Sequence, residues 1–329
     1  MKWREEQHED RLTELQMKFV NLRLGTFIHF NSATAQFHSG EIEDWEFDHE
    51  NAGAPRRYPF DEKRWNPDAL DCAQWARVAK QGGMRFAALT AKHHEGFALW
   101  PSAWTEHCVK NAANPTDVVA AYLKAFREAG IVAGLYFSVL DLTAGINRNS
   151  CNAAQKAMIK GQLTELLTNY GEIPFLIVDG WNAPWGGPSY DMLPFEELDR
   201  LVKSLQPDCL LMNIGWNRDI SGTDILFFEN GAGQQMYAGF AGPGALCQKL
   251  TRTWFWRETD PDTAPASAEW AAELMESCFE KNASFLLNLS PDVHGRIDGN
   301  LAAEFARFGR LAKLPAPLTE PPEGWMVRK

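Results

Sequence analysis

Short apolar runs alternate with amphipathic patterns along most of the chain. The apolar runs are rich in branched and aromatic residues and lack strict alternation, which is typical of strands buried on both faces. In the segments between them, apolar positions recur at spacings of three and four residues, and this period predicts helices. We expect strands at residues 24–30, 85–90, 131–138, 174–179, 209–213, 224–229, 253–258 and 284–290.

The predicted helices have recognisable ends, because several begin close to a proline and finish at a glycine. The segment between the fifth and sixth strands, IGWNRDISGT, is too short for a full helix. A further helix is expected at residues 1–22. The helices between and after the strands are predicted at residues 67–83, 115–130, 152–171, 193–206, 243–251, 267–282 and 300–313.

This order of elements predicts an α/β fold, a (β/α)8 TIM-like barrel that is irregular because one crossover helix is missing. An open doubly wound sheet is the alternative architecture. It is disfavoured because no GxGxxG turn follows the first strand and because polar residues end nearly every strand. We expect residues 1–329 to form a single domain, with the helix at residues 1–22 packed on the barrel.

Charge and composition narrow the functional class. The formal net charge of −11 argues against nucleic-acid binding, which requires clustered Lys and Arg. No uncharged apolar stretch reaches the roughly 18 residues of a membrane span, and residues 1–20 lack the apolar core of a secretory signal. The six cysteines are widely spaced without a CxxC pair, which favours free thiols. These features predict a cytoplasmic protein; they carry no signal for its oligomeric state.

Two carboxylates end separate predicted strands. Asp179 follows the apolar run FLIV, and Glu229 follows ILFF. In a barrel the carboxyl ends of the strands share one mouth, where catalytic groups collect. A pair of carboxylates is the equipment of a glycosidase, and retaining enzymes hold the two about 5–5.5 Å apart. The alternatives are a turn-capping role for Asp179 and a structural ion pair with a barrel arginine for Glu229.

The adjacent residues His93 and His94 follow another strand and raise the question of a metal site. Neighbouring side chains on an extended segment point to opposite sides, so we expect the two rings not to share one ion. The HExxH zinc signature, a phosphate-binding loop and a GxSxG serine motif are all absent from the sequence. We therefore predict no metal and no cofactor, and assign the histidines to hydrogen bonds with sugar hydroxyls.

Several segments, in order along the chain, resemble the α-L-fucosidases of glycoside hydrolase family 29. FIHF at residues 27–30 is similar to the family's FIHFG opening. FAALTAKHHEGFALWPSAWTEHCVKN at 86–111 resembles its LTAKHHDGFCLWPS segment. AGIVAGLYFS, QLTELLTNYGEIPFLIVDG and NASFLLNLSPDVHGRID also match family patterns, which extends the resemblance to residue 298.

The resemblance implies roles for individual residues. Asp179 matches the family's nucleophile, and Glu229 is the expected general acid/base, with Glu258 as the runner-up. The expected substrate-binding residues are His29, Trp45, His93, His94, Tyr136, Trp181 and Trp254.

The resemblance also implies an activity, namely exo-acting retaining hydrolysis of terminal α-L-fucose through a covalent glycosyl-enzyme. The partner would be a fucosylated oligosaccharide or glycoconjugate. The chain departs from the family at HHEG instead of HHDG, at Asn31 in place of glycine, and at LIVDG and SVLDL. Because these departures lie near the expected pocket, two alternatives stay open: a fucose-like sugar such as an α-L-galactoside, and a non-catalytic fucose-binding relative. We expect the C-terminal β-sandwich that many members carry to be missing.

Overall fold

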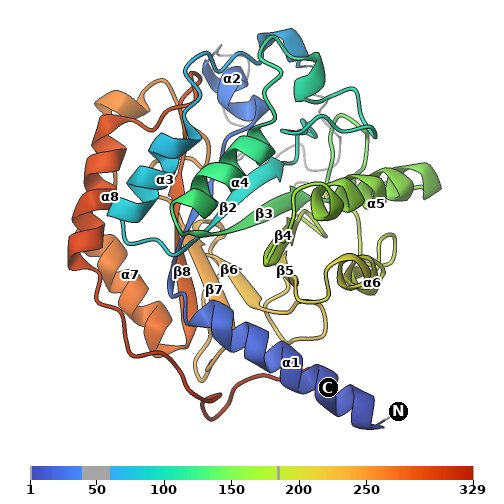
Figure 1. The fold of residues 1–329 in the computed structure, drawn as a ribbon, viewed down its shortest axis with the longest axis vertical. Coiled ribbons are helices and arrows are strands. Elements are labelled where there is room, and N and C mark those ends of the chain that lie inside the picture. Colours follow the sequence, from blue (N-terminus) through green and yellow to red (C-terminus); the bar gives the residue numbers. More distant parts are fainter. Residues whose placement is uncertain (1, 39–59, 184–185, 329) are drawn as a thin grey trace.

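Eight parallel strands close into a barrel in chain order, and β8 pairs with β1 (Figure 1). The computed structural model describes residues 2–38, 60–183 and 186–328. Most strand positions are fully buried, as both-sided burial inside a ring of helices requires. The predicted barrel is therefore confirmed. Its strands are β1 (Leu24–Ile28), β2 (Phe86–Lys92), β3 (Val132–Ser138), β4 (Phe175–Asp179), β5 (Leu210–Ile214), β6 (Leu226–Glu229), β7 (Gly244–Gln248) and β8 (Ala283–Leu289).

Helices surround the strands, and the described connection between β5 and β6 has none, as its length predicts. Between β6 and β7 there is only the 3-10 helix η4 (Asn230–Ala232). The remaining short turns are η2 (Glu62–Arg64), η3 (Val109–Asn111) and η5 (Asp260–Asp262). The outer helices are α2 (Ser32–His38), α3 (Cys72–Gln81), α4 (Val118–Glu128), α5 (Ala153–Thr168), α6 (Phe195–Leu205), α7 (Ala268–Glu280) and α8 (Gly299–Leu311).

Side chains placed just before the helices fix where they begin. Asp71 accepts a hydrogen bond from the backbone N–H of Gln74 at the start of α3, and Asp117 does the same for Ala120 in α4. At α5, Asn152 and Gln155 form a reciprocal capping box. These caps satisfy backbone donors that a helix cannot satisfy itself, so the short connections after the strands end at defined points.

The seventh strand was assigned incorrectly from the sequence. The predicted helix at 243–251 contains β7, and the predicted strand at 253–258 is an irregular segment after it. GALCQ is too short for periodicity to separate a strand from a helix. Gly244 is required there because a Cβ atom would lie 2.6 Å from the Phe240 ring. The aromatic residues of TWFWR have strand propensity but are buried in the barrel mouth instead of pairing.

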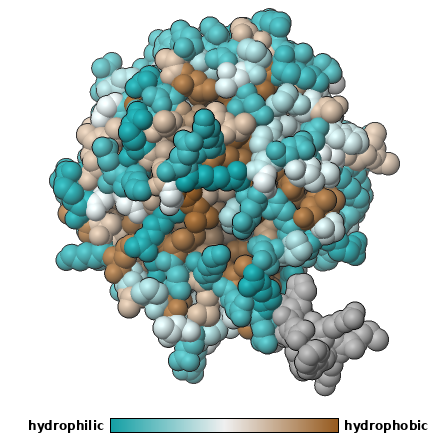
Figure 2. Space-filling view, viewed as in Figure 1, coloured by the Kyte–Doolittle hydropathy of each residue, from teal (hydrophilic) through white to brown (hydrophobic). Residues whose placement is uncertain are grey.

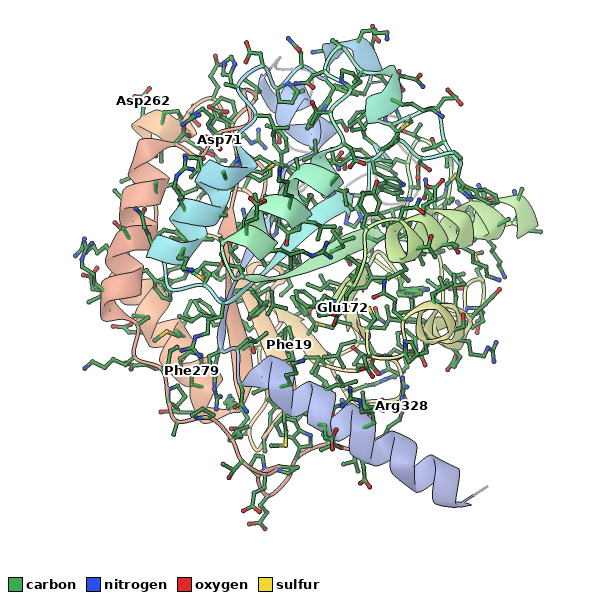
Figure 3. All side chains as sticks on the ribbon, viewed as in Figure 1. Phe19, Asp71, Glu172, Asp262, Phe279 and Arg328 are labelled. Atoms are coloured by element: carbon green, nitrogen blue, oxygen red, sulfur yellow. The ribbon has the colours of Figure 1, made fainter. Side chains whose placement is uncertain are left out.

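The helix α1 (Lys2–Val20) covers the end of the barrel where the strands begin (Figure 3). The Phe19 ring lies 4.8 Å from the ring of Phe86 and 5.3 Å from that of Phe175, which are the first residues of β2 and β4. The C-terminal segment returns to this helix, where Trp325 Nε1 donates to Gln16 Oε1 over 3.3 Å. The opposite end of the barrel is the mouth in which the strands finish.

The outer surface is dominated by polar groups. Figure 2 shows hydrophilic residues over most of one face, with smaller hydrophobic patches between them. None of the helices that the structure describes is long and apolar enough to cross a membrane.

A buried ion pair joins the end of β2 to the loop after β3. Lys92 Nζ lies 2.9 Å from Asp141 Oδ2, and both side chains are almost completely buried. The ammonium also lies over the Phe137 ring, and Asp141 Oδ1 accepts from the Ala144 N–H. Because His93 and His94 follow Lys92 directly, this pair anchors the segment that carries them.

We expect Asp141→Ala to lower the free energy of unfolding by about 3–5 kcal/mol, because it leaves the Lys92 ammonium buried without its counter-charge. Urea denaturation measures the loss. The control is Glu269→Ala, which removes an exposed ion pair with Arg307 that solvent already screens. A loss for Asp141→Ala no larger than for this control would contradict the anchoring role.

Candidate active site

Strand register places Asp179 and Glu229 on the same side of the barrel wall. Val178 pairs with Asn213 and Asn213 pairs with Leu226, so Asp179 lies level with Phe227. Phe227 points into the interior, where its ring is 6.0 Å from that of Phe27. Glu229 comes two residues later on the same face. The two carboxylates therefore stand at successive heights of one mouth.

Asp179 is held by two hydrogen bonds, and its side chain is largely buried, with 13% of its surface exposed. Tyr136 Oη donates to its Oδ2 over 2.8 Å, and the Gly180 N–H donates to its Oδ1 over 2.6 Å. Burial raises the pKa of Asp179 to about 6, and these two donors oppose that rise because they stabilise the ionised carboxylate. Burial, followed by the Asp179 charge, raises the pKa of Tyr136 well above its usual value, so its hydroxyl stays a donor.

The expectation that His93 and His94 point to opposite sides is wrong. Their ring centroids lie 4.2 Å apart. The β2–β3 register shifts between Thr90 and Lys92, and the Gly96 N–H bonds to the His93 carbonyl in a turn. The two histidines thus follow the strand instead of continuing it, and the alternation of an extended segment does not apply to them.

The hydrogen bonds around His94 determine which ring nitrogen carries its proton. Ser138 Oγ donates to the Leu140 carbonyl over 2.8 Å, so it must accept from His94 Nδ1, which is 2.7 Å away. The Nε2 of a neutral His94 is then an acceptor, and it faces Asp179 Oδ2 at 3.7 Å. His94 Nε2 and Asp179 Oδ2 are both acceptors, so their 3.7 Å separation favours the binding of a ligand hydroxyl group between them.

His29 and His93 are oriented in the same way. The Asn288 amide donates to the Trp254 carbonyl over 2.7 Å, so its Oδ1 faces His29 Nδ1 at 2.7 Å and accepts that proton. His93 Nδ1 lies 3.2 Å from Glu95 Oε2, and an ionised Glu95 accepts from it. Burial raises the pKa of Glu95 to about 7.

All three imidazoles are neutral at pH 7. Burial lowers the pKa of His93 to about 3 and that of His29 and His94 well below the usual value; neighbouring histidines lower the latter two further. His94 and Asp179 therefore do not form an ion pair, although His94 Nε2 lies 3.7 Å from Asp179 Oδ2. With each Nδ1 acting as a donor, each Nε2 is an acceptor, which suits a ligand that presents several hydroxyl groups.

Glu229 is positioned by an aromatic residue from the irregular segment after β7. Trp254 Nε1 donates to Glu229 Oε1 over 3.1 Å. The same indole stacks on His29, with ring centroids 4.9 Å apart and an interplanar angle of 29°. Trp254 thus connects the candidate acid/base to the group of imidazoles, although its segment was assigned to a strand from the sequence.

A cavity of about 360 Å³ contains both carboxylates. Its wall includes Trp181, whose Nε1 donates to the Leu193 carbonyl and whose ring stacks on Tyr190 at 5.5 Å. Sequence reasoning missed Tyr190, Trp216 and Arg218, which also line it. For Trp216 and Arg218 the available signal was the short connection between β5 and β6, since a loop without a helix is free to line the mouth. Tyr190 lies between β4 and α6, where the sequence offered no comparable signal.

The runner-up for the acid/base lies elsewhere. Glu258 is exposed and is not among the described residues that line the cavity of Asp179 and Glu229. Trp45 lies outside the described residues.

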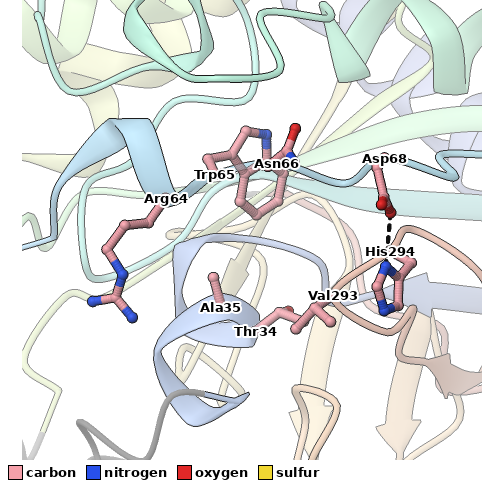
Figure 4. Close-up of a pocket in the computed structure, with 8 residues that line it drawn as sticks. All are labelled: Thr34, Ala35, Arg64, Trp65, Asn66, Asp68, Val293 and His294. Atoms are coloured by element: carbon pink, nitrogen blue, oxygen red, sulfur yellow. Dashed lines mark hydrogen bonds and ion pairs between the residues drawn. The ribbon is translucent and has the colours of Figure 1, made fainter.

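A second cavity, of about 390 Å³, opens beyond β1 and β8, where Trp65 and the hydrogen-bonded pair Asp68–His294 line it (Figure 4). In the part of the chain that the structure describes, no cluster of three or more His, Cys, Asp or Glu is arranged to hold a metal.

Comparison with known proteins decides the family. The model of the family described as Alpha-L-fucosidase matches residues 2–314. The chain belongs to the α-L-fucosidase family. Alpha-L-fucosidase 1 of Arabidopsis thaliana is 30% identical over 263 residues, which are 71% of this chain and 49% of the plant protein. A putative fucosidase of Oryza sativa subsp. japonica is 29% identical, with 48% of its length covered. The chain thus spans about half the length of these two relatives.

A solved structure supports the same assignment. A putative alpha-L-fucosidase from Bacteroides thetaiotaomicron superposes with a TM-score of 0.75 at 25% identity, covering 90% of this chain and 66% of the other. Another fucosidase from that organism, solved as a trapped covalent intermediate with 2-fluoro-fucosyl fluoride, has a TM-score of 0.72 at 19% identity and covers 89% of this chain and 73% of the other. At that identity the second likeness shows the fold alone.

We expect Tyr136→Phe to raise the pKa of Asp179 by about one pH unit, because the ionised carboxylate loses a donor while the protonated form loses less. A 13C NMR titration of the Asp179 carboxyl carbon measures this. Tyr190→Phe is the matched control, since Tyr190 lines the same cavity and its hydroxyl accepts from Asn213. Equal titration of Asp179 in the two variants would refute the contribution of Tyr136.

Proposed function

We propose that this protein is an exo-acting retaining glycosidase that removes terminal α-L-fucose from glycans. The observation that carries the proposal is the largely buried, hydrogen-bonded Asp179 carboxylate in one cavity with Glu229, next to three neutral imidazoles. Membership of the α-L-fucosidase family supports it. A structural neighbour with the same fold was trapped as a covalent intermediate with 2-fluoro-fucosyl fluoride, so a barrel of this fold can accommodate the covalent route.

In the first step, ionised Asp179 attacks the anomeric carbon while Glu229 protonates the departing glycosidic oxygen. The Tyr136 and Gly180 donors keep Asp179 ionised at neutral pH, although burial favours its protonated form. Glu229 then takes a proton from water, the water attacks the same carbon, and the Asp179 ester bond breaks. Two inversions give overall retention of configuration.

The surroundings of the carboxylates favour a deoxy sugar. The acceptor nitrogens of the imidazoles can each receive a hydroxyl proton, which holds a sugar by its ring hydroxyls. Phe255 lies edge-on to His29 at 5.3 Å and to His93 at 4.9 Å, which brings an apolar edge among the polar groups. An apolar edge suits the methyl group of fucose better than the hydroxymethyl group of L-galactose. The presence of both carboxylates favours turnover over a purely binding role.

We expect Asp179→Ala to lower kcat/KM for 4-nitrophenyl α-L-fucoside by at least about three orders of magnitude. Added azide should then give β-L-fucosyl azide, because azide takes the place of the missing nucleophile. Proton NMR of the product assigns the anomer. Hydrolysis by this variant at close to the wild-type rate would eliminate Asp179 as the nucleophile.

Glu229→Ala should slow the cleavage of natural glycans far more than that of activated aryl fucosides, which need little acid assistance. Azide should rescue this variant as α-L-fucosyl azide, since the fucosyl-enzyme still forms. Glu258→Ala is the comparison variant. If Glu258→Ala gives the α-azide and Glu229→Ala does not, the acid/base is Glu258.

A further inference from the structure

Arg218 presents a guanidinium group at the cavity that holds Asp179 and Glu229. It lies in the connection between β5 and β6, lines the cavity, and is exposed. Within the described residues, no carboxylate oxygen lies within the 4.0 Å of an ion pair with Arg218. This cavity therefore carries a positive charge at its wall that a neutral sugar does not require.

The guanidinium is held in place by an aromatic platform. The Arg218 Cζ lies 3.8 Å from the centroid of the Trp216 ring. The indole is fixed in turn: its Nε1 donates to Asp219 Oδ1 over 3.0 Å, and a Cβ atom on Gly222 would lie 2.6 Å from its ring atoms. The Tyr190 ring meets the indole edge-on at 5.1 Å. Stacking on a fixed ring reduces the entropy that an arginine side chain loses on binding a ligand.

The nearest acidic residue in sequence is already engaged. Asp219 Oδ1 accepts from the Ser221 N–H and hydroxyl as well as from Trp216. Asp219 therefore supports the platform through hydrogen bonds, and the N–H edges of Arg218 and the face away from Trp216 stay available at the cavity. A guanidinium group prefers planar or tetrahedral oxyanions, to which it donates two parallel hydrogen bonds.

The position of Arg218 relative to the carboxylates indicates which part of a substrate it meets. In the proposed reaction Glu229 protonates the leaving oxygen, so the leaving-group sugar lies on the Glu229 side of the bond. The segment that carries Arg218 is linked to the Glu229 side, because Asn217 Nδ2 donates to Gln234 Oε1 over 3.5 Å and the same oxygen accepts from the Glu229 N–H. Arg218 lines the same cavity as Glu229. The imidazoles lie on the other side of the scissile bond, where His94 is next to Asp179, and would contact the fucose.

We propose that Arg218, stacked on Trp216, forms a subsite for an anionic group, a sulfate ester or a carboxylate, on the sugar to which the fucose is attached. The proposal rests on the proposed function, which places the fucose at Asp179 and the sugar that carries it on the Glu229 side. The Arg218 subsite makes the protein selective for acidic fucosylated glycans over neutral ones.

Calorimetry with ligands that resist hydrolysis tests the subsite directly. The ligands are an S-linked α-L-fucosyl-galactoside, its O3-sulfated and O6-sulfated forms, and its C6-carboxylate form. We expect wild-type protein to bind at least one anionic ligand about fivefold more tightly than the neutral one at low salt. The preference should shrink as ionic strength rises. The sulfated and carboxylated arms identify which anion is preferred.

Arg218→Gln should remove this preference and Arg218→Lys should retain part of it. The matched control is Arg85→Gln, which removes an exposed arginine at the opposite end of the barrel, and it should keep the full preference. Equal affinity of the wild type for all ligands overturns the proposal, as does a preference that survives in Arg218→Gln or the absence of binding. Hydrolysis of 4-nitrophenyl α-L-fucoside is measured separately. A protein that discriminates between the ligands without hydrolysing this fucoside loses the proposed function and keeps the anionic subsite.

Discussion

The hydrogen bond from Tyr136 to Asp179 is the interaction on which the rest of the site depends. Burial raises the pKa of this carboxyl group and the Tyr136 hydroxyl opposes that rise, which matters because a protonated acid cannot act as a nucleophile. Tyr136 is on β3 and Asp179 on β4, and the register of these two strands fixes the distance between them. The register between β3 and β4 therefore matters for the chemistry as well as for the stability of the barrel.

Polar residues at other strand ends orient the imidazoles in a comparable way. Ser138 ends β3 and Asn288 lies near the end of β8, and each directs the proton of one histidine to Nδ1. Neutral rings with defined tautomers act as acceptors without adding positive charge beside the nucleophile. A cationic histidine there would stabilise the carboxylate and weaken its attack. The buried Lys92–Asp141 pair keeps the one nearby ammonium of β2 neutralised.

The sequence was informative wherever a residue's place follows from its own strand. Asp179 and Glu229 end apolar runs, and both lie in the mouth as expected. It was uninformative where placement depends on other elements. GALCQ is a strand because it pairs with β6 on one side and β8 on the other, and these partners are distant in sequence. Trp254 donates a hydrogen bond to Glu229 from an irregular segment. The shared orientation of His93 and His94 depends on a register shift that no periodicity reports.

Mass spectrometry of the protein after reaction with 2-deoxy-2-fluoro-α-L-fucosyl fluoride tests the central claim most directly. The fluorine at C2 slows both formation and breakdown of the fucosyl-enzyme, because it destabilises the oxocarbenium-like transition states of both steps. The fluoride leaving group at C1 speeds formation alone, so the ester accumulates. Peptide mapping should find one 2-fluorofucosyl group, attached to Asp179. A group attached to any other carboxylate, or protein that stays unmodified while it hydrolyses aryl fucosides, would contradict the account.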